Sequence, residues 1–289
     1  MTRLAIFGGE PVRKEPFALW PQFDEREKAA LIEVLESGVW GGYSPKVAEF
    51  EQAFADFHEA KYGVTAANGT VTLEAALNAA GIRAGDEVIV PPISFIATAT
   101  AVLRVGAVPV FADIDESTYN LDPARAREAV TGRTRAIIPV HFAGQPADMD
   151  ALIELAERRD LVVIEDCAHA HGATWRGRRV GGFGAFGSFS FQASKNMTGG
   201  EGGILITNDG ELAEASRSVC NQGRRTGFWH LLQWRSRALE LPILVPAGIF
   251  SHPTFPLKNQ SARHHVIEKS AVMTYQQQGP SVIGQQVFQ

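Results

Sequence analysis

Cysteine, long hydrophobic runs and a secretory leader are scarce or missing in this sequence of 289 residues. Cys167 and Cys220 are the only two thiols, so no disulfide framework is expected and a reducing compartment is favoured. No run of about 18 apolar residues occurs, which argues against a membrane-spanning helix. Gly8-Gly9 and nearby prolines stand where a secretory signal needs an apolar core. We therefore expect a soluble, cytoplasmic protein without a membrane partner.

An excess of basic residues is lacking as well. Lysine and arginine total 27, aspartate and glutamate total 32, and the formal net charge is −5. Proteins that bind nucleic acids usually carry the opposite balance, so no nucleic-acid partner is expected. Hydrophobic residues make up 45% and charged residues 20% of the chain, which is ordinary for a folded globular protein.

Acidic residues nearly disappear after position 229. Only Glu240 and Glu268 occur there, in a stretch that is rich in glutamine and has no sustained helical or strand period. We predict a folded body of residues 1–229, which begins with a helical segment, and an atypical, poorly ordered tail of residues 230–289. A truncated or frameshifted C-terminus would produce this contrast, and so would a flexible arm that wraps a partner subunit.

Helical and strand patterns alternate through the body. Helices are predicted at residues 24–38, 44–57, 68–77, 94–104, 123–130, 149–158 and 211–220, and strands at residues 63–67, 87–90, 108–112, 135–140, 161–165, 188–191 and 203–207. Several strands are continuous apolar runs, which is typical of a mainly parallel sheet with helices on both faces. Ligands of such α/β folds bind beyond the carboxyl ends of the strands, so residues just after each strand are the candidates for chemistry.

The first candidate is the turn Asn68-Gly69-Thr70-Val71, which leads from a strand into a helix. Free backbone N–H groups and the helix dipole make such a turn a possible phosphate site. The simpler alternative is that Thr70 only caps the helix.

The second candidate is the segment from Glu165 to His171, which includes Asp166, Cys167 and His169. Asp166 ends a predicted strand, where its carboxylate can meet a protonated ring nitrogen. A metal cluster is disfavoured because no second group of ligands with matching spacing accompanies these residues. The structural alternative is that Asp166 caps the next turn and that the histidines are buried and hydrogen-bonded.

The third candidate is Lys195, which follows the predicted strand at residues 188–191 and precedes the glycine-rich stretch 199–203. Small and glycine residues allow a planar cofactor to come close, and an amine with a lowered pKa can form a Schiff base. An ordinary loop lysine is the alternative.

A fourth pattern, Gly182–Gly187, spells G-x-G-x-x-G but does not fit a nicotinamide site. That fingerprint requires a strand before it and a helix after it. Here the segment 176–179 reads as a turn, a strand follows, and no acidic residue stands at the distance that would bind a ribose.

The three remaining motifs complement one another. They supply a phosphate cradle, a carboxylate for a pyridinium nitrogen and a lysine for an aldehyde. Pyridoxal 5'-phosphate (PLP) needs this set of groups, so PLP is the expected cofactor.

The sequence from about Phe7 to Arg225 resembles the DegT/DnrJ/StrS-type sugar aminotransferases, which are PLP enzymes. The most specific blocks are Glu165–Gly172 and Ser188–Gly203, and the spelling Asp-Cys-Ala-His-Ala-His-Gly is closest to the branch of aminohydroxybenzoate synthases and keto-cyclitol aminotransferases. Other matching segments are Phe50-Glu51, Asn68–Thr70, Pro92–Phe95, Asp113–Asp115, Pro139–His141 and Pro146–Asp150.

The resemblance implies a role for each candidate residue. Lys195 matches the Schiff-base lysine and Asp166 the partner of the pyridine nitrogen, whereas His169 matches the residue beside the cofactor's phenolic oxygen. Ser190 and the backbone amides of the turn match the phosphate ligands, and an aromatic residue matches the ring that stacks on the cofactor. These phosphate and stacking positions are Gly69, Thr70, Val71 and Phe95; no metal is implied.

The resemblance also implies the fold, the reaction and the assembly. The fold is the large α/β domain of the aspartate-aminotransferase type, and the reaction is transfer of an amino group from glutamate or glutamine to a keto sugar or keto cyclitol, in a homodimer. The family continues with a Gly-x-Asn-Tyr-Arg segment and a small C-terminal domain, which are not found after Arg225. The alternative is therefore a PLP-binding fragment without turnover.

Overall fold

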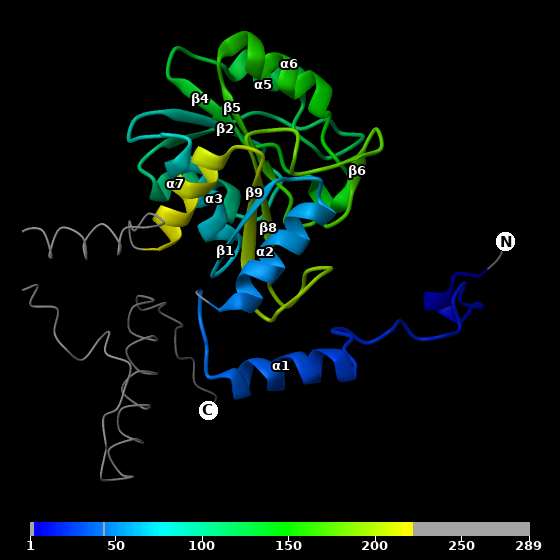
Figure 1. Ribbon diagram of the computed structural model, residues 1–289. Helices are drawn as coiled ribbons and strands as arrows, with labels where there is room; N and C mark the ends of the chain where they lie inside the picture. The colour runs from blue at the N-terminus through cyan, green and yellow to red at the C-terminus, as the bar shows by residue number, and fades with distance from the viewer. Residues whose placement is uncertain (1–2, 43, 222–289) are drawn as a thin grey trace, which may run out of the picture. The chain divides into compact units, whose positions relative to one another are not determined.

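The computed structural model describes residues 3–42 and 44–221, and Figure 1 shows their arrangement. The predicted tail at residues 230–289 lies outside the described residues. Before the sheet come a short 3₁₀ helix, η1 (Ala5–Phe7), and two helices, α1 (Glu25–Ser37) and α2 (Pro45–Phe57).

The start and end of α1 are those predicted from its sequence. Asp24 and Glu27 form a reciprocal capping box, in which each side chain accepts a backbone N–H at the helix start. Gly38 ends the helix with φ of 65°, a left-handed conformation that glycine adopts without steric cost.

The body contains one sheet of seven strands in the order β1-β9-β8-β5-β4-β2-β3. The strands are β1 (Tyr62–Ala66), β2 (Glu87–Val90), β3 (Val108–Phe111), β4 (Thr134–Ile137), β5 (Val162–Asp166), β8 (Phe186–Ser190) and β9 (Gly203–Thr207). Neighbouring strands are parallel from β3 to β8, whereas β9 pairs antiparallel with both β1 and β8. The predicted mainly parallel sheet is confirmed, and the carboxyl ends of β1, β2, β4, β5 and β8 share one edge.

Helices cover both faces of the sheet (Figure 1). Successive side chains of a strand point to opposite faces, so Ile164 packs in the cluster with α3 and α4, and Val163 packs in the cluster with α6. The covering helices are α3 (Gly69–Ala79), α4 (Ala97–Arg104) and α7 (Gly210–Cys220) on one face and α2, α5 (Pro123–Ala129) and α6 (Met149–Arg159) on the other. This covering on both faces explains why apolar side chains point to both faces of central strands such as β5.

Two elements are shorter than their sequence patterns predict. The helix expected from residue 94 begins only at Ala97, and the strand expected to reach residue 140 ends at Ile137. Prolines lie close to both points: Pro91-Pro92 come before α4, and Pro139 comes two residues after the end of β4. A proline supplies no N–H for a helix or a sheet. Both shortened elements leave irregular backbone at the carboxyl edge of the sheet.

A short hairpin was not predicted. Strands β6 (Thr174–Trp175) and β7 (Arg178–Arg179) pair around Arg176 and Gly177, whose φ values of 49° and 83° suit a type I′ turn. The turn predicted at residues 176–179 is therefore confined to its first two residues. Phe57, at the end of α2, is 50% exposed, and the Arg179 guanidinium lies over its ring at 3.6 Å from the ring centroid.

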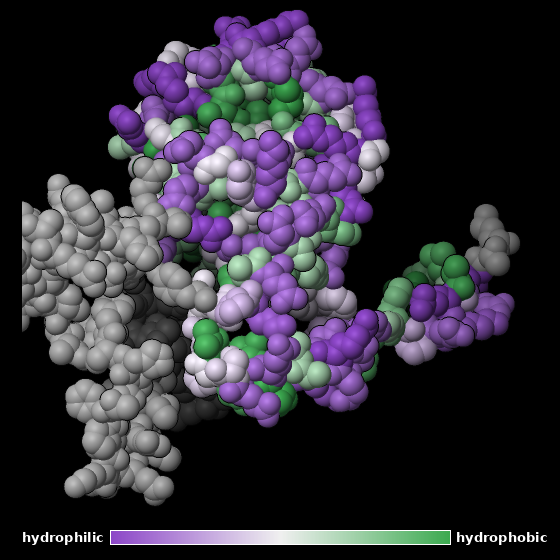
Figure 2. Space-filling model, viewed as in Figure 1, coloured by the Kyte–Doolittle hydropathy of each residue, from purple (hydrophilic) through white to green (hydrophobic). Residues whose placement is uncertain are grey.

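The described surface of the body is mainly hydrophilic in the view of Figure 2, whereas apolar side chains are exposed on the N-terminal segment and α1. Leu31, Ile32 and Leu35 of α1 are all more than half exposed. No helix among residues 3–42 and 44–221 is both long and apolar enough to cross a bilayer.

Candidate active site

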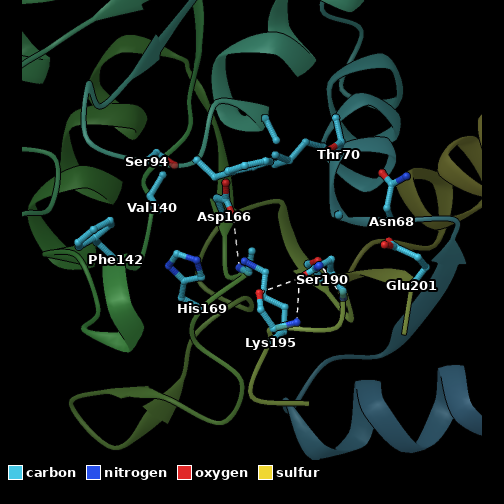
Figure 3. Close-up of a pocket in the computed structure, with 17 residues that line it drawn as sticks. Asn68, Thr70, Ser94, Val140, Phe142, Asp166, His169, Ser190, Lys195 and Glu201 are labelled. Atoms are coloured by element: carbon cyan, nitrogen blue, oxygen red, sulfur yellow. Dashed lines mark hydrogen bonds between the residues drawn. The ribbon is translucent and has the colours of Figure 1, made fainter. Parts of the chain in front are cut away.

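A pocket of about 700 Å³ opens at the carboxyl edge of the sheet (Figure 3). It is bounded by the first turn of α3, the segments that follow β2 and β4, the end of β5 and the loop after β8. Predicted site residues on its wall are Gly69, Thr70, Phe95, Asp166, His169, Ser190 and Lys195. The structure thus brings together residues that are separated by more than a hundred positions in the sequence.

Asp166 is held from four directions at the end of β5. Its main-chain N–H donates to the Pro139 carbonyl at 2.8 Å, and its carbonyl accepts the N–H of His141 at 3.1 Å. One carboxylate oxygen accepts the Thr98 hydroxyl at 2.8 Å, and the other accepts the Ala168 N–H at 3.2 Å. The side chain is only 6% exposed, so these bonds fix the direction of a buried charge.

The first turn of α3 presents backbone donors to the pocket. The Asn68 side chain, rather than Thr70, caps the helix by accepting the Val71 N–H at 3.0 Å. Val71, predicted to offer its amide to the cofactor, is not on the pocket wall. The amides of Gly69 and Thr70 lie in the first turn, where no acceptor exists within the helix, so these two remain as anion donors.

The close approach of α3 to β8 requires a glycine at position 69. A Cβ atom at this position would lie 2.8 Å from the Cβ of Ser190, at the end of β8. A glycine therefore lets the helix start approach Ser190 closely. In Figure 3 Thr70 and Ser190 lie to one side of Asp166 and Phe142 to the other, so the helix start and the Ser190 hydroxyl share one end of the pocket.

Lys195 is half-buried in the loop that follows β8. Its N–H donates to the Gln192 carbonyl at 2.8 Å, which starts a turn, and the Gln192 side chain accepts the N–H and hydroxyl of Ser194. Burial lowers the pKa of the Lys195 amine, and the attraction of Asp166 offsets part of this change. A lower pKa increases the share of neutral amine, which is the nucleophilic form.

His169 lines the pocket near Lys195 (Figure 3). Burial lowers its pKa first, the positive charge of Lys195 lowers it further, and Asp166 acts in the opposite direction. The imidazole is therefore held in its neutral form near pH 7, when one ring nitrogen donates a hydrogen bond and the other accepts one.

Three backbone N–H groups at the start of the glycine-rich stretch Gly182–Gly187 are already occupied. The Glu165 carboxylate accepts the N–H groups of Gly181, Phe183 and Gly184 at 2.7–2.8 Å. The bend that the letters G-x-G-x-x-G suggest is present, but it surrounds a carboxylate of this same chain. No donor of these three is left for a dinucleotide phosphate, which agrees with the sequence argument against a nicotinamide site.

One group of three potential metal ligands occurs among the described residues: His141, Glu165 and Cys167. His141 Nδ1 accepts the Ala147 N–H at 3.0 Å, so Nε2 carries the proton and donates to Glu165 at 3.1 Å. Complete burial raises the pKa of the Cys167 thiol well above its usual range. The imidazole has no lone pair free and the thiol stays protonated, so the chemistry of this group does not suit a metal.

Sequence reasoning missed several residues of the pocket wall. Ser94, Val140, Phe142 and Glu201 line it, and Thr98 lies behind Asp166. Ser94 stands next to Phe95 in a segment that the resemblance already singled out. Thr98 lies four residues after Ser94, and their hydroxyl oxygens are 2.7 Å apart; that spacing was the available signal.

Comparison with known proteins gives consistent results. A family model described as the DegT/DnrJ/EryC1/StrS aminotransferase family matches residues 21–238. A putative L-glutamine:3-amino-2,3-dideoxy-scyllo-inosose aminotransferase from Streptoalloteichus tenebrarius is 49% identical over 249 residues, which are 83% of this chain and 60% of the relative. The chain therefore spans about 60% of the length of this curated relative.

Solved structures agree in fold. The crystal structure of 3-amino-5-hydroxybenzoic acid synthase is 45% identical, with a TM-score of 0.68 over 70% of this chain and 54% of that chain. The PLP form of a putative sugar aminotransferase from Streptococcus pneumoniae is 32% identical, with a TM-score of 0.65 over 68% of this chain and 56% of that chain. The sheet is therefore that of the large domain of PLP fold type I, and the chain belongs to the DegT/DnrJ/EryC1/StrS aminotransferase family.

Proposed function

We propose that this pocket binds PLP and that the chain carries the cofactor site of an aminotransferase. The amino donor is glutamine or glutamate and the acceptor is a keto cyclitol or a related keto sugar. The observation that carries the proposal is the convergence of Lys195, Asp166 and the start of α3, with Gly69 against Ser190, on one pocket.

The anion end of the pocket fits a phosphate. The Gly69 and Thr70 amides and the Ser190 hydroxyl are donors on that wall, and the positive end of α3 favours a negative charge. The space beside Gly69 is one that a Cβ atom would fill. Ser190 is 7% exposed, so a phosphate there is shielded from water on one side.

Asp166 and Phe95 suit the ring of the cofactor. Bound PLP supplies a protonated pyridine ring that withdraws electrons from the substrate's Cα–H bond. Asp166, held by Thr98 and Ala168, offers a fixed negative charge that keeps a ring nitrogen protonated. Phe95 is 67% exposed on the pocket wall, where its ring is available for stacking, and His169 offers a hydrogen bond to the cofactor's phenolic oxygen.

Lys195 suits two tasks. Its amine, with a pKa lowered by burial, would hold PLP through the cofactor's aldehyde. When free, the same amine would be the group that moves a proton between the substrate's Cα and the cofactor's C4′. Asp166 limits this pKa shift, so the amine can take up a proton as well as give one.

The substrate class and the assembly rest on the relatives. The Streptoalloteichus relative is named for glutamine as donor and an aminodideoxy-scyllo-inosose as substrate. A homodimer in the cytoplasm is proposed with it. The homodimer is supported by the exposure of two adjacent apolar side chains, Phe95 on the pocket wall at 67% and Ile96 next to it in sequence at 65%. Because the chain covers about 60% of that relative, cofactor binding and turnover are separate questions for experiment.

The test is PLP uptake by the purified chain. We expect a visible absorption band on addition of PLP, and borohydride followed by peptide mass mapping should place the cofactor on Lys195. Lys195→Ala should abolish the band, whereas Lys61→Ala, an exposed lysine outside the pocket, should not. A protein that stays colourless with excess PLP would overturn the assignment. Turnover is then assayed with glutamine, glutamate and a panel of keto cyclitols.

A further inference from the structure

Thr98 donates its hydroxyl proton to a carboxylate of another element, whereas Thr72 and Thr100 lie within reach of main-chain carbonyls of their own helices. Thr72 also contacts the Ser188 hydroxyl of β8 at 2.7 Å. A helical threonine commonly donates to a carbonyl three or four residues earlier. Thr72 donates to the Gly69 carbonyl at 2.7 Å, and Thr100 lies 3.4 Å from the Ala97 carbonyl. Thr98 instead donates across to Asp166 at 2.8 Å, from the first turn of α4 to the end of β5. This contact joins two elements 68 positions apart in the sequence.

The number of hydroxyl protons fixes the direction of the two hydrogen bonds that connect Ser94, Thr98 and Asp166, a chain called the relay below. Thr98 has one hydroxyl proton, and an ionised Asp166 can only accept. The second contact of the Thr98 oxygen, to the Ser94 hydroxyl at 2.7 Å, must therefore be one in which Ser94 donates. The order is Ser94 to Thr98 to Asp166, and both hydroxyl dipoles point their positive ends toward the carboxylate.

We propose that Thr98 and Ser94 are positioning residues for the PLP site and act through Asp166. This inference rests on the proposed function. The relay holds the Asp166 carboxylate in one orientation, and it ties the segment that carries Phe95 to the end of β5. Phe95 lies between the two hydroxyl residues in the sequence. The same pair of hydrogen bonds therefore holds the backbone that carries Phe95 and the Asp166 carboxylate in a fixed relation to each other.

The hydrogen bond between Thr98 and Asp166 is buried, so its loss cannot be compensated by solvent. Thr98 is 1% and Asp166 is 6% exposed, so water cannot simply replace the hydroxyl. Without the Thr98 donor, one carboxylate oxygen keeps no donor in the described structure, since the Ala168 N–H bonds to the other oxygen. A hydrogen bond to a charged group contributes more than one between neutral groups. The carboxylate would then turn away from its present direction to find a donor.

The experiment measures PLP affinity by absorbance and fluorescence titration in matched variants. Thr98→Val keeps the shape and removes the hydroxyl, Thr98→Ser keeps the hydroxyl, and Thr100→Val is the control on the same helix. We expect Thr98→Val to weaken PLP binding by about 10-fold, or about 1.4 kcal/mol. Thr98→Ser and Thr100→Val should stay within about 2-fold of the wild type, and far-UV circular dichroism checks that each variant is folded.

A double-mutant cycle separates positioning from a general structural role. In an Asp166→Ala background, Thr98→Val should change PLP affinity by less than about 2-fold, because the group through which it acts is gone. If Thr98→Val does not fold, Ser94→Ala takes its place in the same cycle, with a smaller expected loss of about 3-fold.

The outcomes are distinct. A wild-type chain that takes up no PLP overturns the proposed function and this inference together. A wild type that binds PLP, with Thr98→Val binding equally well, overturns this inference alone. A loss of the same size with and without Asp166 also overturns it, since Thr98 would then act on the helix rather than on the carboxylate.

Discussion

Gly69 shows how one missing side chain shapes a binding site. We expect Gly69→Ala to reduce PLP affinity by about 10-fold and to lower the free energy of unfolding by about 1–3 kcal/mol, because the new Cβ would lie 2.8 Å from the Ser190 Cβ and push the helix start away. Urea unfolding and PLP titration measure the two effects. Gly132→Ala is the control, since nothing lies within 4 Å of its Cβ position. Equal affinities in both variants would contradict the close approach.

His171 gives a pH dependence to stability. It lies among Phe54, Phe189 and Phe191, and burial lowers its pKa from the usual 6.5 to about 4. Between these values the unfolded chain binds the proton and the folded chain does not, so the free energy of unfolding falls as the pH falls from about 6.5 to 4.

His171→Phe should flatten part of this slope. The change should be on the order of 1–3 kcal/mol between pH 7 and pH 4. Burial also lowers the pKa of His58, so His58 should maintain the remaining dependence of the unfolding free energy on pH. Urea unfolding at several pH values measures the slope, and an unchanged slope in the variant would show that His171 titrates normally.

At the scale of elements, Glu165 holds a loop to a strand. Its buried carboxylate accepts three backbone N–H groups from the segment at residues 181–184 and one N–H from His141. Glu165→Gln places an NH₂ group against these donors, and we expect a loss of about 2–4 kcal/mol in the free energy of unfolding. Glu157→Gln, at an exposed position of α6, is the matched control. A variant as stable as its control would show that the loop does not depend on the charge.

The elements also show what the sequence could predict. The alternation of strand patterns with helical patterns located the seven sheet strands, several of them as continuous apolar runs. Most of these strands are largely buried, as in β2 and β9, whereas β3 at the edge of the sheet is only partly buried. The β6–β7 hairpin was missed because two-residue strands have no measurable period. Thr98 was missed for a different reason: its partner, Asp166, is distant in the sequence, and only the packing of α4 beside β5 brings them together. Lys195 and Asp166 were found because each follows a predicted strand, whereas Ser190 was found through the resemblance to the family.

At the scale of the whole molecule, cofactor binding should stabilise the fold. A ligand that binds only the folded state adds about 2.7 kcal/mol at a free concentration of 100 times its dissociation constant. We therefore expect PLP to raise the Tm of the wild-type chain in a concentration-dependent way and to leave Lys195→Ala nearly unaffected. A Tm that does not respond to PLP while the visible band appears would show that the cofactor attaches without contacting the phosphate end.

The reversed strand β9 has a consequence for how the chain folds. It lies between β1 and β8 and pairs with both, so the first strand of the sheet joins the rest only through the last one. During synthesis β1 leaves the ribosome some 140 residues before its partner, because Tyr62 pairs with Thr207. Until then the open edges of β1 and β8 present unpaired backbone groups, which are sites for misassociation. The start of α3 follows β1 directly and lines the pocket with Ser190 of β8, so the pocket is completed only when this last pairing forms.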